Sequence, residues 1–495
     1  MQEGNTMSTA EAADLVAQAG FFTGSFIAGQ WRQPASGGGQ EVRDPADDSL
    51  LAIVADSSVD ECLEAVEAAA AAARAWAATP PRDRGETLRR AFELMRAEAE
   101  TIAELITREN GKLLGDARSE VVYAAEFFRW FSEEAVRVGG DYRVAPNGDK
   151  RIVVARHPIG VSLLVTPWNF PAAMATRKLG PALAAGCTVV LKPATETPLT
   201  ATYLVDLLDR AGVPAGVVNL VLPADPGPAV SAMLHHPAVR KLSFTGSTEV
   251  GRALLHQAAD NVVSTAMELG GNAPVIVLED ADLDAAVDGV IVAKMRNGGA
   301  ACTAANRIYV HQSLAEDFTD RLTARMGRLQ LGPGLDSASQ VAALVSHREV
   351  DKVATLVEAA VAAGARATTG GRRPSGPGAF YPATVLADVE HGNPVTREEI
   401  FGPVAPIIVF DEEEQAIEWS NDTDRGLIGY VFSADVGRAV RVGHRLEVGM
   451  VAINSGVASD PAAPFGGIKQ SGLGREGSDL GIEEFLEVQY LAVPL

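Results

Sequence analysis

Two sequence segments carry side chains suited to covalent and acid–base chemistry. Cys302 closes the segment Arg296-Asn-Gly-Gly-Ala-Ala-Cys302, whose small residues predict a loop that leaves the sulfur open to approach. A lone cysteine is more often a buried apolar side chain, but a loop setting favours a nucleophile. Glu268 begins Glu268-Leu-Gly-Gly-Asn272, a glycine-rich turn predicted to follow a strand, where it is either a general base or a surface carboxylate.

Three further segments, each after a predicted β-strand, favour a nucleotide site: Thr166-Pro-Trp-Asn-Phe-Pro171, Leu191-Lys-Pro-Ala-Thr-Glu-Thr-Pro198 and Phe244-Thr-Gly-Ser-Thr-Glu-Val-Gly251. Ligands bind at the carboxyl ends of strands in an open α/β sheet. Lys192 is a cation suited to ribose hydroxyls or a phosphate, and Gly246 and Ser247 at a helix start offer donors to a pyrophosphate. An ordinary capped turn explains any one segment, but three together favour nucleotide binding.

The first of these segments also places a polar group beside apolar walls. Asn169 supplies an amide donor, and Trp168 and Phe170 on either side of it could wall a pocket. Taken alone, this segment is better explained as a capped turn, so its interpretation depends on the neighbouring segments.

The elements that position these residues differ between two parts of the chain. Residues 56–137 contain few glycines or prolines and predict helices, among them 59–76 and 84–110, the second stopped by Gly111. From Ile152 onward, strands predicted at 161–165, 188–191, 217–221 and 239–244 alternate with helices predicted at 172–185, 199–211, 228–235 and 248–259. This alternation predicts a parallel sheet with right-handed crossovers, the frame of a nucleotide-binding domain.

A second α/β stretch begins near Glu268, with strands predicted at 273–278, 308–311 and 404–410 and a helix at 283–294. Residues 142–156 predict a two-stranded arm around the turn Pro146-Asn-Gly148. Residues 486–493 alternate like a strand, and a terminal strand without a hairpin partner often pairs with another element or another subunit.

Composition limits the classes of function. The chain has 495 residues, 47% of them hydrophobic, which predicts more than one domain. A net charge of −22 argues against binding nucleic acid, and no long apolar run predicts a membrane span. Residues 1–20 lack the features of a targeting signal. Three scattered cysteines predict no disulfide framework and no metal site, and they fit a reducing, cytoplasmic compartment.

The chain resembles aldehyde dehydrogenases over nearly its whole length, from about Phe26 to Tyr490. The segments that carry the resemblance stand in the family's order and at matching intervals: Thr166 to Pro171, Lys192-Pro-Ala, Phe244-Thr-Gly-Ser, Glu268-Leu-Gly-Gly, Cys302, Glu399-Ile-Phe-Gly-Pro403 and Pro464-Phe-Gly-Gly467. One departure is Ala300, where the family often has a glutamine.

The resemblance implies an α/β fold with three parts. These are a Rossmann-like NAD(P)-binding domain (residues 21–139 and 157–267), an α/β catalytic domain (268–482) and a small β oligomerisation element (140–156 and 483–495). It also implies a homodimer or homotetramer.

The resemblance further implies a mechanism. Cys302 attacks the aldehyde, and the Asn169 side-chain amide and the Cys302 amide hold the oxyanion. Hydride leaves to the cofactor, and Glu268 activates the water that hydrolyses the thioester to a carboxylate.

For the cofactor, the residues implied are Thr166, Pro167, Trp168, Lys192, Thr195, Glu196, Gly246, Ser247, Glu399 and Phe401. NAD-preferring relatives often carry a glutamate where this chain has Thr195. A carboxylate there would repel a 2′-phosphate, so the sequence favours NADP, with NAD left open by the neighbouring Glu196.

For the substrate, the chain is most similar to succinate-semialdehyde dehydrogenases, as in Ala172-Ala-Met-Ala-Thr-Arg-Lys178 and Arg296-Asn. The likeness implies that Arg177, Arg296 and Ser459 bind a carboxylate, with Phe170 and Phe465 in the same pocket. The alternatives are glutarate semialdehyde, a neutral aliphatic aldehyde, and a coenzyme A-acylating reaction, which Glu268 argues against. A non-catalytic binding protein on the same fold is disfavoured by the intact set of Cys302, Glu268 and Asn169.

Overall fold

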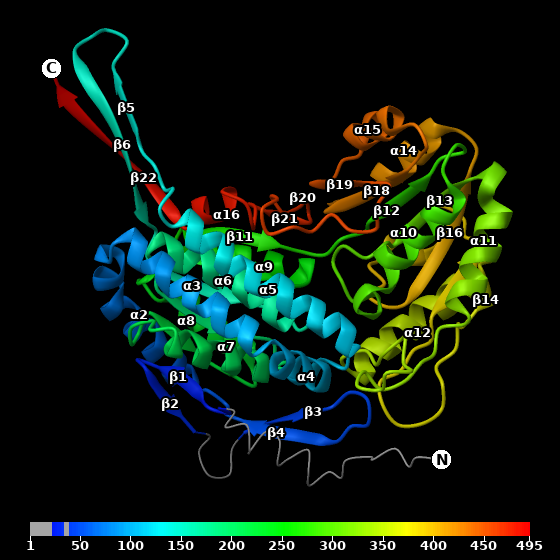
Figure 1. Ribbon diagram of the computed structural model, residues 1–495, viewed down its shortest axis with the longest axis horizontal. Coiled ribbons are helices and arrows are strands. Elements are labelled where there is room, and N and C mark those ends of the chain that lie inside the picture. Colours follow the sequence, from blue (N-terminus) through cyan, green and yellow to red (C-terminus); the bar gives the residue numbers. More distant parts are fainter. Residues whose placement is uncertain (1–21, 34–38) are drawn as a thin grey trace.

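The computed structural model describes residues 22–33 and 39–495. The chain forms two α/β bodies side by side, with a long β arm projecting from one of them (Figure 1). Residues 1–20, for which the sequence predicts no targeting signal, lie outside the described residues. In the described ranges no helix is both long enough and apolar enough to cross a membrane.

The first body contains an eight-stranded sheet in the order β2-β1-β9-β8-β7-β10-β11-β21. Its five central strands run parallel: β9 (Val218–Leu220), β8 (Val189–Lys192), β7 (Val161–Val165), β10 (Val239–Thr245) and β11 (Ser264–Glu268). Antiparallel strands extend both edges: β1 (Ser25–Ile27), β2 (Gln30–Arg32) and β21 (Gly472–Leu473). The parallel sheet predicted from the alternation of strands and helices is confirmed.

Helices cover both faces of this sheet because its strands present apolar side chains on both sides. Leu164 of β7 packs into one core, whereas its neighbour Leu163 packs into the other. The first core is shared with α3 (Pro81–Ala97), α4 (Ala99–Asn110), α5 (Leu114–Glu134), α6 (Pro171–Ala185) and α7 (Pro198–Arg210). The second is shared with α2 (Val59–Ala78) and α8 (Pro226–His235), and Leu254 and Ala258 of α9 (Thr248–Asp260) also belong to it.

The second body contains a seven-stranded sheet in the order β14-β15-β16-β13-β12-β18-β19. All but β14 run parallel: β15 (Thr384–Ala387), β16 (Val404–Phe410), β13 (Arg307–His311), β12 (Pro274–Val277), β18 (Ile428–Phe432) and β19 (Met450–Ile453), with β14 (Arg366–Thr369) antiparallel at the edge. One face carries α10 (Leu283–Met295) and α11 (Gln312–Met326). The other carries α12 (His347–Ala362), α13 (Pro394–Arg397), α14 (Glu413–Asn421) and α15 (Val436–Arg445).

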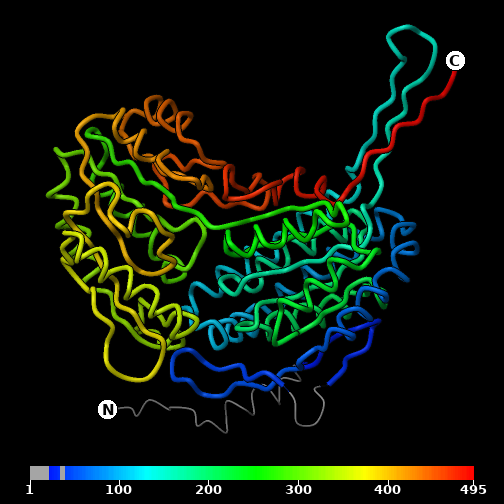
Figure 2. The backbone as a smooth tube through the Cα atoms, turned by 180° about the vertical axis from the view of Figure 1, so that it is seen from behind, coloured from blue at the N-terminus to red at the C-terminus, as the bar shows by residue number. Residues whose placement is uncertain are grey.

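The arm is a three-stranded antiparallel sheet that leaves the first body and ends near the C-terminus of the chain, as Figure 2 shows from the opposite side. It contains β5 (Asp141–Val144), β6 (Lys150–Pro158) and β22 (Leu486–Pro494). The terminal strand β22 pairs with β6 along its whole length, from Leu486 opposite Pro158 to Pro494 opposite Lys150. The two-stranded arm and the C-terminal strand predicted from the sequence are therefore present and joined.

Short elements complete the fold: β3 (Gln40–Arg43), β4 (Leu50–Val54), β17 (Arg425–Gly426), β20 (Ile468–Lys469), the 3₁₀ helix η1 (Arg296–Gly299) and α16 (Leu480–Glu483). One prediction was wrong in detail, because residues 84–110 do not form a single helix. Glu98 leaves helical geometry between α3 and α4, and its carboxylate is bound by Arg210 and by Tyr203 instead. The predicted stop at Gly111 is confirmed, with a left-handed φ of 90°.

Candidate active site

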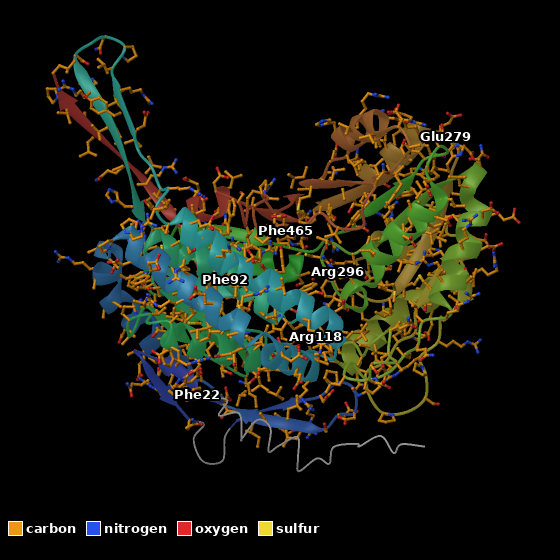
Figure 3. The ribbon with its side chains drawn as sticks, in the orientation of Figure 1. Phe22, Phe92, Arg118, Glu279, Arg296 and Phe465 are labelled. Carbon is orange, nitrogen blue, oxygen red and sulfur yellow. The ribbon has the colours of Figure 1, made fainter. Side chains whose placement is uncertain are left out.

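Two cavities meet at Cys302, at the junction of the two bodies. One, here called the substrate cavity, measures about 210 Å³ and lies against α5 and α6. The other, here called the cofactor cavity, measures about 230 Å³ and extends between the two bodies. Cys302, Met174, Arg177 and Phe465 line both cavities. Phe465 and Arg296, labelled in Figure 3, mark this junction.

Cys302 follows η1 in the loop that the sequence predicted, and it is half-buried. Burial, together with the nearby carboxylates of Glu268 and Glu399, raises the pKa of its thiol to about 12, while Arg177 and Arg296 act in the opposite direction. The resting sulfur is therefore protonated, and it needs a base before it can act as a nucleophile.

Glu268 ends β11 and is buried beside Cys302 in the cofactor cavity. Both of its carboxylate oxygens are buried and lack a hydrogen-bond partner within the described residues. Burial and the neighbouring Glu476 raise its pKa well above the usual range. Gly466 leaves room for this carboxylate, since a Cβ atom there would lie 2.8 Å from Glu268 Oε1.

Asn169 lies between β7 and α6, and its backbone carbonyl is fixed from two sides. That oxygen accepts hydrogen bonds from Lys112 Nζ at 2.7 Å and from Asn297 Nδ2 at 2.8 Å. The Asn169 side chain donates from Nδ2 to the Ala300 carbonyl at 3.2 Å. The backbone amide of Cys302 donates to no group in the part of the chain that the structure describes.

Six of the predicted cofactor residues line the cofactor cavity: Pro167, Trp168, Gly246, Ser247, Glu399 and Phe401. The Trp168 and Phe401 rings meet edge to face, with centroids 5.3 Å apart. Ser247 caps α9. Glu399 Oε1 accepts a hydrogen bond from the Gly271 amide at 3.0 Å, and a Cβ on Gly270 would lie 2.7 Å from Glu399 Oε2. The glycines therefore allow Glu399 to sit against the backbone.

The remaining four predicted cofactor residues, Thr166, Lys192, Thr195 and Glu196, lie at or just after the ends of β7 and β8. Lys192 is buried, its side-chain ammonium has no hydrogen-bond or ion-pair partner among the described residues, and burial lowers its pKa to about 8. Glu196 accepts a hydrogen bond from Thr195 at 3.1 Å and pairs with Arg348 at 3.4 Å.

These residues fit a dinucleotide. Lys192 is a buried cation without a partner, and Thr245 Oγ1, which belongs to a residue lining the cofactor cavity, is buried and also unpartnered in the described chain. A buried polar group without a partner costs free energy unless a ligand satisfies it. Lys192, Thr245 and the N-terminus of α9 offer donors of the kind that phosphates require, and the Glu399 carboxylate can accept hydrogen bonds from ribose hydroxyls.

All five predicted substrate residues line the substrate cavity: Phe170, Arg177, Arg296, Ser459 and Phe465. Arg177 is buried, its Nε lies 2.7 Å from Glu476 Oε2, and its guanidinium lies over the Phe465 ring at 4.0 Å. Arg296 donates to Thr303 Oγ1 at 3.2 Å. Two guanidinium groups therefore face the cavity that contains the sulfur.

Sequence reasoning missed several polar residues of this site. Glu476 pairs with Lys178 Nζ at 2.6 Å as well as with Arg177, and Lys112 Nζ pairs with Glu120 at 2.6 Å. Tyr123 also lines the substrate cavity. Lys178 stands inside a segment that carried the likeness to succinate-semialdehyde enzymes, so a signal for it was present. Tyr123 stands in an unremarkable helical stretch.

Comparison with known proteins identifies the family. The model of the aldehyde dehydrogenase family matches residues 31–491. This chain belongs to the aldehyde dehydrogenase family. It is 51% identical to a succinate-semialdehyde dehydrogenase of Paenarthrobacter nicotinovorans, over 90% of this chain and 99% of that protein. It is 46% identical to a glutarate-semialdehyde dehydrogenase of Pseudomonas putida, over 95% and 97%.

The fold agrees with solved structures of the family. A crystal structure of an NADP dependent enzyme of E. coli superposes with a TM-score of 0.94 at 45% identity, covering 96% of this chain and 98% of that one. The predicted aldehyde dehydrogenase fold is confirmed.

Proposed function

We propose that this aldehyde dehydrogenase oxidises an anionic aldehyde, succinic semialdehyde, to its dicarboxylate with NADP as the hydride acceptor. The observation that carries the proposal is the lining of the substrate cavity, where Arg177, Arg296 and Ser459 share one space with Cys302. The protein's net charge of −22 repels an anion at long range, so local cations must hold it. Guanidinium groups suit a carboxylate because they present paired donors.

The geometry supports a covalent mechanism. A base removes the Cys302 thiol proton, and the thiolate attacks the aldehyde carbon to give a tetrahedral oxyanion. Asn169 Nδ2 and the Cys302 amide are the donors for that oxyanion, and one such donor is worth about 3 kcal/mol. NADP, when bound, supplies the acceptor for the hydride that leaves the former aldehyde carbon, and a thioester remains on Cys302.

Glu268 then activates water. Its unpartnered oxygens and raised pKa make it a stronger base than an ordinary carboxylate, able to take a proton either from the thiol or from the attacking water. Hydroxide adds to the thioester carbonyl, the carbon–sulfur bond breaks, and the carboxylate product leaves.

The preference for NADP rests on the residues near Lys192. Thr195 carries no charge, and the carboxylate of Glu196 is bound to Arg348 and Thr195. The Glu196 carboxylate is therefore paired rather than free to repel a 2′-phosphate beside Lys192. We expect at least a tenfold higher kcat/KM with NADP than with NAD, measured by initial rates. A tenfold preference for NAD would contradict the assignment.

Glutarate semialdehyde is a second candidate substrate, favoured by the similarity to the Pseudomonas putida enzyme. One measurement separates the candidates: kcat/KM for succinic semialdehyde, glutarate semialdehyde and butanal, with and without coenzyme A. We expect succinic semialdehyde to exceed butanal by about a hundredfold, the value of one well-made charged contact. Equal values for the charged and neutral aldehydes would exclude the anionic substrate.

We also infer a cytoplasmic homodimer or homotetramer, assembled through the arm. Exposed apolar side chains cover β5 and β22, including Tyr142, Val488, Tyr490 and Leu491. Such a surface on a monomer is unusual unless a partner covers it. Truncation after Leu486 should give monomers or aggregates by analytical ultracentrifugation, whereas an active monomeric full-length protein would contradict the inference.

A further inference from the structure

Tyr123, in the middle of α5, carries a hydroxyl group that is not explained by the contacts of the described residues. Its Oη atom is buried and makes no hydrogen bond to any residue that the structure describes. Burying a hydroxyl without a partner is unfavourable, so such a group calls for an explanation. The explanation follows from its location, because Tyr123 lines the substrate cavity together with Arg177, Arg296 and Cys302.

The ring of Tyr123 is held in place by its neighbours. It meets the Phe127 ring edge to face, with centroids 5.0 Å apart, and Arg177 lies over that same Phe127 ring at 5.3 Å. Tyr123 and the guanidinium are thus fixed against a common aromatic side chain. Only the hydroxyl hydrogen is free to turn toward a ligand.

The other charged groups of the cavity already have partners. Glu120 accepts from Lys112 and from the amides of Ala172 and Ala173, and Asp116 accepts from the Asn297 amide at 3.2 Å. Arg177 pairs through Nε with Glu476, but its Nη2 is buried and without a partner in the described chain. Besides Arg296 and Ser459, the cavity therefore offers an anion two buried donors that have no partner among the described residues, Arg177 Nη2 and Tyr123 Oη.

We propose that Tyr123 Oη donates a hydrogen bond to the distal carboxylate of the aldehyde, which makes Tyr123 a specificity residue beside Arg177 and Arg296. The inference rests on the proposed function, since it needs an anionic substrate. A site with buried donors discriminates strongly against an analogue that cannot accept from them, because the donors then stay unpaired. Tyr123 therefore rejects neutral aldehydes as well as binding anionic ones.

The test removes the hydroxyl alone. In Tyr123→Phe, we expect KM for succinic semialdehyde to rise at least tenfold while kcat stays within twofold, and the kinetics with butanal to stay unchanged or improve. Isothermal titration of the variant with succinate should give at least a tenfold weaker Kd, a readout independent of turnover. The melting temperature should not fall, because the lost hydroxyl had no partner.

The matched control is Tyr381→Phe. Tyr381 also has a buried hydroxyl without a partner in the described residues, but it lines neither cavity. It should leave KM for both aldehydes and the succinate Kd unchanged.

The outcomes separate the two levels of the argument. If the wild-type enzyme does not prefer succinic semialdehyde to butanal, the proposed function fails and this inference fails with it. If the wild type prefers the anion and Tyr123→Phe keeps both the preference and the succinate affinity, only the role of Tyr123 is wrong. Equal losses for both aldehydes, or a variant that no longer folds, would mean that the hydroxyl serves the fold and would also overturn the inference.

Discussion

The two cavities on either side of Cys302 hold their charges in different ways. In the substrate cavity Arg177 is buried and paired with the buried Glu476 at 2.7 Å. At the cofactor cavity Arg348 has 75% of its side chain exposed and meets Glu196 at 3.4 Å. Water can replace a lost partner at the exposed pair but not at the buried one.

The two cavities also differ in which elements build them. The substrate cavity is lined by α5, α6, η1 and loops near Cys302, whereas the cofactor cavity takes Ser247 from the start of α9 and Lys352 from α12. The substrate's charge is thus met in part by the buried Arg177, whereas Arg348 at the cofactor cavity is exposed. Substitutions of the substrate-binding charges should therefore have larger effects than substitutions of the exposed charges at the cofactor cavity.

Glu268 lines the cofactor cavity beside Cys302, where the two cavities meet, and its loss should have the largest effect. In Glu268→Gln we expect kcat to fall about a thousandfold, since a positioned base contributes between about a hundredfold and ten-thousandfold. The thioester should accumulate on Cys302 after one burst of NADPH, detected by stopped flow and by the mass of the intact protein. Glu249→Gln, on α9, is the control. A burst absent from Glu268→Gln would mean that Glu268 acts before the thioester forms.

The pH dependence of the wild type follows from the same residue. Burial and Glu476 raise the pKa of Glu268, so its basic form is scarce below that pKa and increases as the pH rises through it. The rate of thioester hydrolysis should therefore rise with pH through a range above that of an ordinary carboxyl group and then level off. A single-turnover rate that falls as the pH rises there would contradict the role of a base.

The substrate cavity is tested next by Arg296→Ala. We expect KM for succinic semialdehyde to rise about a hundredfold, because truncating one side of a buried charged contact costs about 2–5 kcal/mol. Butanal should be nearly unaffected. The control Arg321→Ala removes an exposed arginine of α11 that pairs with Asp284. Equal losses for both aldehydes would assign Arg296 to the fold.

The sequence predicted the residues of this site that stand in short motifs at strand ends. Cys302 and Glu268 were found because small or glycine-rich neighbours mark their turns, and Asn169 was found because its segment follows a predicted strand. Both α/β sheets were also predicted, since period and β-branching reveal strands locally. The division into residue ranges for three domains remains a prediction, and β21 shows that the chain returns to the first sheet from within 268–482.

The rest of the site depends on contacts between distant segments. Tyr123 faces the cavity only because α5 packs along α6, and nothing in its own neighbourhood distinguishes it from a core tyrosine. Glu476 binds Lys178, which stands 298 residues earlier in the sequence. The break at Glu98 likewise depends on Arg210, 112 residues away. Such long-range pairing leaves no periodic signal in a single sequence.

The cofactor cavity should give a smaller effect that depends on pH. Burial lowers the pKa of Lys192 to about 8, so the ammonium is present below that pH and is lost as the pH rises through it. The Kd of 2′,5′-ADP, a probe for the 2′-phosphate, should be constant below about pH 8 and weaken by up to about tenfold per unit above it. The Kd of 5′-ADP should change less. In Lys192→Met the Kd values of the two probes should depend on pH in the same way. A difference between the probes that persists in this variant would exclude Lys192 as the group that binds the 2′-phosphate.

The smallest effect is expected at the exposed pair. Glu196→Gln removes a carboxylate near Lys192 and releases Arg348, which favours a 2′-phosphate in both respects. Exposed ion pairs are worth roughly 0.2–1 kcal/mol, so the NADP-to-NAD ratio of kcat/KM should rise only about threefold. If the Arg348 guanidinium reaches the 2′-phosphate, Arg348→Gln should lower the NADP-to-NAD ratio by a similar factor. The double variant measures whether the two effects are coupled. A fall in the ratio for Glu196→Gln would mean that the carboxylate binds the cofactor's ribose directly. The contrast between a buried ion pair at the substrate cavity and a weak exposed pair at the cofactor cavity would then be wrong at Glu196.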